Sequence, residues 1–180
     1  AENLAVILRK SISSKPFIQL REELDTIESY IKIQKIRFAG RFLYETEIPD
    51  VLEDCVIPKM ILQPLVENAI YHGMEFMDGD GEIFISAWKE GEDLYLKVSD
   101  NGLGMTEEQV ARLFSDTPHT GSSRGSGIGV KNVNERIRLY FGSEYGLSIE
   151  SEPDEGTVVT IHLPAVAYSE IRQKEEHDKT

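Results

Sequence analysis

The sequence predicts an α/β two-layer sandwich, in which a mixed sheet of about five strands is covered by helices on one face. Two patterns lead to this prediction. Short segments alternate apolar and polar side chains with the period of a half-buried strand, and longer segments repeat apolar side chains at helical spacing. The two kinds of segment follow one another along the chain, which favours a sheet and helices that share one core.

The first long helix is expected over residues 20–38, after a short amphipathic helix over residues 2–12 and a turn at residues 11–16. Its apolar positions follow helical spacing, with charged residues between them: Leu20, Leu24, Ile27, Ile31 and Phe38. Ile33 and Ile36 widen this stripe, so we expect the helix to pack against two partners. It can serve as a cover for the core or as a helix of a dimer or bundle.

The strands are expected as one single segment and two pairs. Residues 42–48 alternate strictly and form the single strand. Residues 82–89 and 93–99 are joined by a Glu-Gly-Glu turn and form a hairpin. Residues 147–152 and 157–163 form the second pair, joined through a Pro-Asp-Glu-Gly turn.

Two further helices complete the predicted sandwich. One is expected over residues 58–72, where Pro58 fits the first turn and Pro64 should kink the helix or delay its regular part. The other is expected over residues 130–141, with Gly142 as its stop signal.

Composition excludes several classes of function. The 180 residues carry 19 Lys and Arg against 32 Asp and Glu, a formal net charge of −13. Such acidity repels phosphate backbones, so general nucleic-acid binding is not expected. No apolar run is long enough to span a bilayer, and the single cysteine, Cys55, fits a reducing compartment.

A first candidate site lies on the helix expected over residues 58–72. Asn68 and His72 are four residues apart, so they point in the same direction on a helix. An amide oxygen on an otherwise apolar helix can complete the coordination of Mg²⁺ that phosphates already hold. The alternative is that both are hydrogen-bonded polar groups of the core, which is the more common case.

A second candidate site follows the strand over residues 93–99. Asp100 ends that strand, and Gly102 and Gly104 follow at alternate positions before Met105. Glycines allow the backbone to approach a flat ligand closely, and an ionised Asp can accept a hydrogen bond from the amine of adenine. An ordinary Asp-Asn-Gly turn explains the same residues equally well.

A third candidate site precedes the helix over residues 130–141. Gly125, Gly127 and Gly129 alternate and lead directly into its N-terminus, where exposed backbone N–H groups suit phosphate. The pattern is neither a Walker loop nor a Rossmann fingerprint. Residues 106–124 before it are expected to form a mobile lid.

The order of these motifs resembles the Bergerat-type ATP-binding fold of gyrase-type ATPases, chaperones and histidine kinases. Four stretches look more specifically like sensor histidine kinases of the LytS/YesM type: "LREELDTIESYIKIQKIRF", "IPKMILQPLVENAIYHG", "DNGLGM" and "GSGIGVKNVNERIRLYFG…GLSIESEPDEGTVVTIHLP". The resemblance covers about residues 20–164.

The resemblance implies a site for ATP and Mg²⁺. By position, Asn68 would ligate Mg²⁺, Asp100 would bind the adenine amine, and Thr157 would support Asp100 through water. The three glycines of the third motif would present amides to the phosphates. The full set of implied nucleotide-binding positions is Asn68, His72, Asp100, Gly102, Gly104, Met105, Gly125, Gly127, Gly129 and Thr157.

Two positions depart from the broader histidine kinase pattern. Many such kinases carry Lys three residues after the Asn, where this chain has Tyr71, and an acid or Asn four residues before it, where this chain has Pro64. Glu67 is the nearby acid and the candidate catalytic residue beside Asn68, although it is rotated by about 100° from Asn68 on a helix.

The resemblance also implies an organisation. Residues 1–38 would end the dimerisation and acceptor region, residues 39–165 would form the catalytic domain, and residues 166–180 would be a disordered charged tail. None of the four histidines has the context of a phosphoacceptor: His72, His119, His162 and His177. The acceptor histidine is therefore expected upstream, in a membrane-bound parent that forms a homodimer, lies on the cytoplasmic side and passes phosphate to a response regulator.

Two enzymes of the same fold class are the alternatives. An ATP-driven conformational clamp would need a hydrolytic acid on the nucleotide helix and a further domain after the sheet. A serine kinase of the anti-sigma type normally lacks a helix like that over residues 20–38. A degenerate binding module is disfavoured, because Asn68, Asp100 and the expected glycines are all present.

Overall fold

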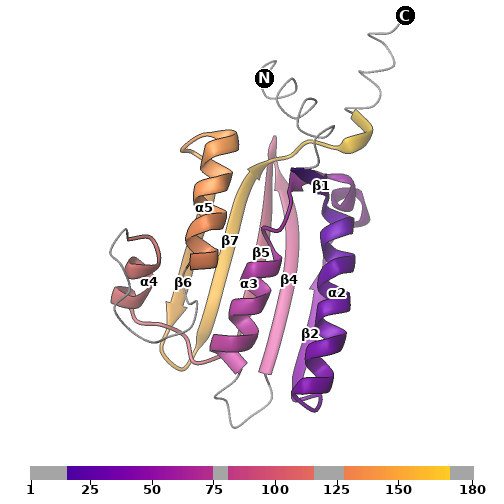
Figure 1. Ribbon diagram of the computed structural model, residues 1–180. Helices are drawn as coiled ribbons and strands as arrows, with labels where there is room; N and C mark the ends of the chain where they lie inside the picture. Colours follow the sequence, from indigo (N-terminus) through magenta and orange to yellow (C-terminus); the bar gives the residue numbers. More distant parts are fainter. Residues whose placement is uncertain (1–15, 75–80, 116–127, 171–180) are drawn as a thin grey trace, which may run out of the picture.

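The computed structural model describes residues 16–74, 81–115 and 128–170, and its main layer is one mixed sheet (Figure 1). The five strands have the order β2-β4-β5-β7-β6. β2 is parallel to β4, and all other neighbours are antiparallel. The strands are β2 (Phe42–Glu47), β4 (Gly81–Glu90), β5 (Asp93–Asp100), β6 (Gly146–Glu152) and β7 (Gly156–Pro164). The predicted strands are thus confirmed to within a residue or two.

Helices cover one face of this sheet, as predicted (Figure 1). They are α2 (Leu20–Arg37), α3 (Gln63–Asn68) and α5 (Ile128–Phe141). One core joins the two layers, and large fully buried side chains come from both, among them Leu20, Ile27, Ile57, Ile61, Leu62, Ile70, Ile83, Ile85, Leu94, Leu96 and Ile137. Ile33 and Ile36, which were expected to pack against a second partner of α2, are 65% and 83% exposed. No such partner lies among the described residues.

The start predicted for the second helix is wrong. Residues 56–58 form strand β3 (Val56–Pro58) instead, which pairs antiparallel with the short strand β1 (Phe17–Gln19). α3 begins only at Gln63, so that Pro64 lies in its first turn, where its missing N–H costs nothing. The helix then widens into a π-helical segment, η2 (Ala69–Met74).

Other connections add detail that periodicity did not show. A 3₁₀ turn, η1 (Asp50–Asp54), follows β2. Of the expected charged tail, residues 166–170 are described, and the N–H of Val56 donates to the carbonyl of Val166 at 2.8 Å. The helix expected over residues 2–12 and the end of the tail lie outside the described residues.

A buried carboxylate joins α2 to the start of α3. Glu23 is 2% exposed, and its Oε1 accepts from the N–H groups of Leu62, at 2.8 Å, and Gln63, at 3.1 Å. These are among the N–H groups that a helix N-terminus leaves without an intrahelical partner. Burial raises the pKa of Glu23, while the backbone donors and Arg136 act in the opposite direction. Glu23 therefore fixes where α3 begins relative to α2.

Replacement of Glu23 by Ala is expected to lower the free energy of unfolding by about 2–4 kcal/mol, because two backbone donors at a buried helix end lose their acceptor. Glu23→Gln should cost less, since its amide oxygen can still accept from both N–H groups. Glu28→Ala, at an exposed position of the same helix, is the matched control for chemical denaturation. A loss no larger for Glu23→Ala than for Glu28→Ala would contradict this role.

Candidate functional site

Three parts of the chain meet at the end of the sheet where β5 ends and β7 begins. Asp100, the last residue of β5, pairs with Thr157 of β7. The η2 segment contacts β4, β5 and β7. The N-terminal end of α5 lies beside α3 (Figure 1). The fold thus brings the candidate sites of the helix over residues 63–74, the Asp100 loop and the α5 start to one end of the molecule.

Asp100 is a half-buried carboxylate that accepts from backbone donors. The N–H of Gly102 donates to Asp100 Oδ1 at 2.9 Å. Burial raises the pKa of Asp100 to about 6, and the N–H groups of Gly102 and Thr157 oppose that rise. The group is ionised at neutral pH and can accept a further hydrogen bond from a ligand that supplies a donor.

This raised pKa predicts a pH dependence of binding. An amine donor binds the ionised form of Asp100, so the affinity for adenosine, which has no phosphates, should fall by about tenfold between pH 7.5 and pH 5. The free energy of unfolding changes in the other sense: stability present below the unfolded pKa of 3.8 is lost as pH rises through about 6. Equilibrium titration at several pH values measures the first effect, and an unchanged affinity would contradict it.

The loop after Asp100 is held against the β6–β7 turn. Gly104 has a φ of +63°, and a Cβ there would collide with the carbonyl oxygen of Glu152. On the side of the turn, Gly156 has a φ of +101°, and a Cβ there would collide with the carbonyl oxygen of Asp100. The N–H of Asp154 donates to the carbonyl of Leu103 at 2.7 Å. The two glycines are therefore required for the close approach of loop and turn.

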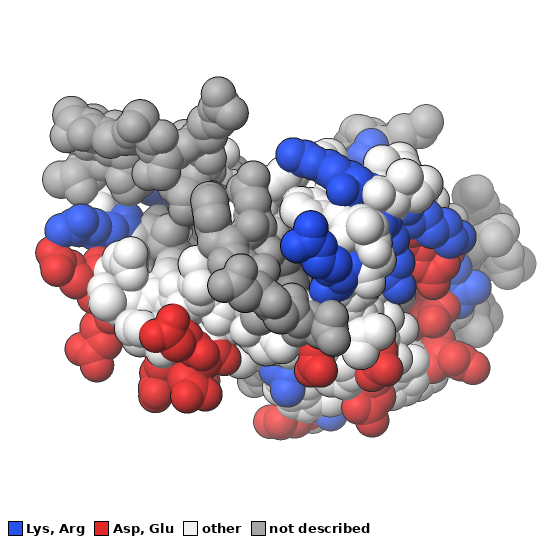
Figure 2. Space-filling view, turned by 90° about the horizontal axis from the view of Figure 1, so that it is seen from below, with Lys and Arg blue, Asp and Glu red and all other residues white. Residues whose placement is uncertain are grey.

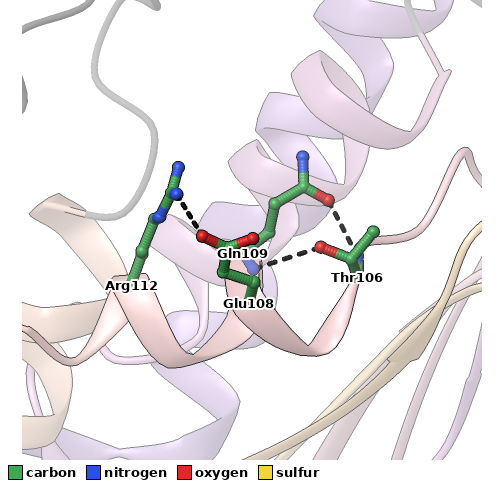
Figure 3. A network of polar contacts seen from close by, with 4 residues as sticks. All are labelled: Thr106, Glu108, Gln109 and Arg112. Atoms are coloured by element: carbon green, nitrogen blue, oxygen red, sulfur yellow. Dashed lines mark hydrogen bonds and ion pairs between the residues drawn. The ribbon is translucent and has the colours of Figure 1, made fainter.

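A short helix follows the loop, where the sequence predicts only a mobile lid. α4 (Glu107–Leu113) begins at a capping box, in which Thr106 Oγ1 accepts from Gln109 N–H at 3.3 Å and Gln109 Oε1 accepts from Thr106 N–H at 2.8 Å (Figure 3). Glu108 and Arg112 pair on its exposed face. The Thr-x-x-Gln spacing was the signal that could have found this helix.

The helix of the first candidate site carries Asn68 at its end and continues through η2. Asn68 is half-buried, and its side chain has no hydrogen bond within the described part of the chain. Glu67 Oε1 accepts from Gln63 Nε2 at 2.9 Å. Arg37 Nη1 donates to the hydroxyl of Tyr71 at 3.0 Å, and its guanidinium lies 5.3 Å from the centre of that ring. A cation from α2 thus lies beside the position where related kinases carry Lys.

The glycines of the third candidate site are described only in part. Gly129 lies in the first turn of α5, and a Cβ there would come to 3.4 Å from the Cβ of Pro64 on α3. The two helices are therefore in close contact at this point. Gly125 and Gly127 lie outside the described residues, as do residues 116–124 of the expected lid, and nothing is described of the His72 side chain.

Charged side chains are unevenly distributed over this end of the molecule (Figure 2). Basic side chains gather on the side of α2, whose last turn carries Lys35 and Arg37. Acidic side chains appear on both sides of this view, and the β6–β7 turn carries Glu152, Asp154 and Glu155. An anionic ligand at this end would be attracted to the α2 side.

The comparison with protein families shows to which family the chain belongs. The model of the histidine kinase-, DNA gyrase B- and HSP90-like ATPases matches residues 54–167, and a histidine kinase model matches residues 1–42. The chain belongs to this ATPase family. The resemblance found in the sequence is thereby confirmed, and the match supports ATP binding by this fold.

Individual relatives of this ATPase family agree. The chain is 39% identical to the sensor histidine kinase YesM of Bacillus subtilis, and this match covers 91% of the chain. It is 35% identical to the sensor histidine kinase BtsS of Escherichia coli over 89% of the chain, and 33% identical to the sensor protein LytS of Bacillus anthracis over 82% of the chain. The matched region makes up only about a quarter of the length of these relatives: 27% of YesM, 26% of BtsS and 25% of LytS.

The fold agrees with solved structures of the family as well. The catalytic domain of the histidine kinase ThkA superposes with a TM-score of 0.64 at 20% identity, over 83% of this chain and 94% of that one. At this sequence identity, the match shows a similar fold and nothing further. Among the helices that the structure describes, none combines the length and the hydrophobicity that a membrane crossing requires.

Proposed function

We propose that the chain binds Mg·ATP at the end of the sheet marked by Asp100 and transfers the γ-phosphate to a histidine, as the catalytic part of a sensor histidine kinase. The observation that carries the proposal is the half-buried carboxylate of Asp100 at the end of β5, which accepts from backbone N–H groups of Gly102 and Thr157. An acceptor in this setting suits the exocyclic amine of adenine. The implied nucleotide-binding positions that the structure describes lie around this end of the sheet.

Asn68 is the residue proposed to hold Mg²⁺. Its amide has no hydrogen bond within the described part of the chain, so its oxygen is available to a ligand. No cluster of three His, Cys, Asp or Glu among the described residues could hold a metal alone. Asn68 therefore fits a metal that the phosphates hold in large part. When bound, the metal would neutralise charge on the phosphates.

The described acids do not supply an evident general base. Glu67 accepts a hydrogen bond from Gln63 on its own helix, and it stays a candidate catalytic residue beside Asn68. Phosphoryl transfer depends mainly on positioning and on charge neutralisation. The cations on the α2 side, with Arg37 against Tyr71, support the placement of the phosphates towards that side.

The acceptor histidine is proposed to lie in a segment that precedes these residues in the kinase. The one histidine whose side chain the structure describes, His162, stacks on Tyr95 at 4.7 Å between ring centres and lies 3.2 Å from Asp93. Asp93 and Tyr95 begin β5, at the end away from Asp100, and His162 of β7 pairs with Tyr95. A second copy of the kinase and a response regulator are the proposed partners, and the cytoplasmic side of a membrane is the proposed location.

Nucleotide titration tests the proposed binding function. Mg·ATP and ADP should each raise the melting temperature of the chain in a concentration-dependent manner, because a ligand that binds only the folded state stabilises it. GTP should give a much smaller shift, because its 6-oxo group is an acceptor that faces the acceptor Asp100. Equal shifts for ATP and GTP, or no shift with ATP, would contradict the proposal.

A further inference from the structure

Three polar side chains lie side by side where the apolar core meets the candidate site. Asp100 of β5 is paired with Thr157 of β7, and Thr157 is paired with Ser151 of β6. They share a face with buried Val98 and Val159, which are two residues away on their strands. Ser151 thus ends a row that crosses three strands on the helix-covered face.

Ser151 uses the whole hydrogen-bonding capacity of its hydroxyl. Its Oγ donates to the carbonyl of Gly156 at 2.8 Å, accepts from the N–H of Met105 at 2.9 Å, and lies 2.9 Å from Thr157 Oγ1. A serine hydroxyl has one proton and two acceptor positions. Because the Gly156 carbonyl can only accept, it takes the Ser151 proton, and Thr157 must donate its own proton to Ser151.

This assignment determines whether the Thr157 hydroxyl can donate or accept a hydrogen bond with a ligand. With its proton on Ser151, the Thr157 hydroxyl can face a ligand or a bridging water only as an acceptor. The neighbouring Asp100 carboxylate is also an acceptor at neutral pH. The side chains of the row therefore present acceptors alone. The 6-amino group of adenine supplies donors to match, whereas a 6-oxo group supplies another acceptor.

We infer that Ser151 is a positioning residue for base selectivity: by holding the Thr157 hydroxyl as an acceptor, it favours 6-amino purines over 6-oxo purines. The inference rests on the proposed function and deepens it, because it names a residue that does not itself contact the base. Ser151 also holds the N–H of Met105, which directly precedes Thr106 and the capping box of α4 (Figure 3). A looser α4 would affect all nucleotides alike, so selectivity separates the two effects.

The test compares the dissociation constants of ATP and ITP, which differ at the 6-position and in the N1 proton that accompanies the 6-oxo group. The unchanged chain should prefer ATP by at least about 100-fold. In Ser151→Ala, the Thr157 hydroxyl is free to turn and donate to a 6-oxo group, so this preference should fall by about tenfold. Ser151→Thr keeps a hydroxyl at the same position and should keep the preference. Ser148→Ala, at an exposed position of β6, is the matched control and should change nothing.

The possible outcomes are separable. Equal losses of ATP and ITP affinity in Ser151→Ala would overturn the inference and leave Ser151 a structural residue, and an unchanged ratio would overturn it as well. If Ser151→Ala does not fold, Thr157→Val provides the test: it should lower ATP affinity and leave ITP affinity nearly unchanged, and a larger loss for ITP would overturn the inference. Failure of the unchanged chain to bind ATP would instead refute the proposed function.

Discussion

Replacement of Asp100 by Asn is expected to weaken ATP binding by about 10- to 100-fold, which corresponds to about 1.5–3 kcal/mol for a hydrogen bond to a charged group. The substitution keeps the size of the side chain and turns one acceptor oxygen into a donor. That donor would face the 6-amino group of adenine, which is itself a donor. Isothermal titration with ATP measures the loss.

Folding must be separated from binding in this experiment. Because burial raises the pKa of Asp100 to about 6, a neutral side chain at this position should not destabilise the fold at neutral pH. The same variant should also lose the pH dependence of adenosine binding. Asp93→Asn, at the opposite end of β5, is the matched control. Unchanged ATP affinity in Asp100→Asn would show that the adenine amine is bound elsewhere.

The strands β4 and β5 were predictable because one face of each is buried. β4 and β5 alternate buried and less buried side chains along their length, so a period of two was visible in the sequence. α5 was predictable for a similar reason, with Val130, Val133 and Ile137 on one buried face. Gly142, with a φ of +106°, ends that helix as expected.

The start of α3 was not predictable from local pattern. Residues 56–58 are buried on both sides, so they show no alternation that could separate a strand from a helix. Their partner strand β1 lies about 40 residues earlier in the sequence. The donors at the start of α3 are satisfied by Glu23, which is also remote in sequence. Tertiary contacts, rather than a local cap, decide this boundary.

The motifs of the candidate site were predictable from the sequence, but the hydrogen bonds that connect the site residues across strands and helices were not. Asp100, Gly102 and Gly104 became candidates because an acid ends a strand and two glycines follow at alternate positions, a pattern that an ordinary turn explained equally well. Ser151 did not, because an isolated Ser in a strand carries no distinctive pattern. Its importance arises only when pairing across β7 brings it to Thr157 and to Met105. Arg37 was missed for the same reason, since its contact with Tyr71 joins two helices.

Phosphoryl transfer is the second large effect expected. With γ-labelled ATP and Mg²⁺, the chain by itself should remain essentially unlabelled, since none of its four histidines stands in a phosphoacceptor context. A longer chain that includes a preceding acceptor segment should become labelled on a histidine. Asn68→Ala should abolish that labelling, because the charge on the transferred phosphoryl group would be poorly neutralised.

Labelling of that longer chain is the most direct test of the account as a histidine kinase. The predicted result is an acid-labile, base-stable phosphohistidine in the acceptor segment, lost in Asn68→Ala and strongly reduced in Asp100→Asn at limiting ATP. Ser148→Ala, at an exposed position of β6, should be labelled as fully as the unchanged chain. Absence of labelling in the longer chain while ATP still binds, or labelling of His72 or His119 in the chain by itself, would contradict the account.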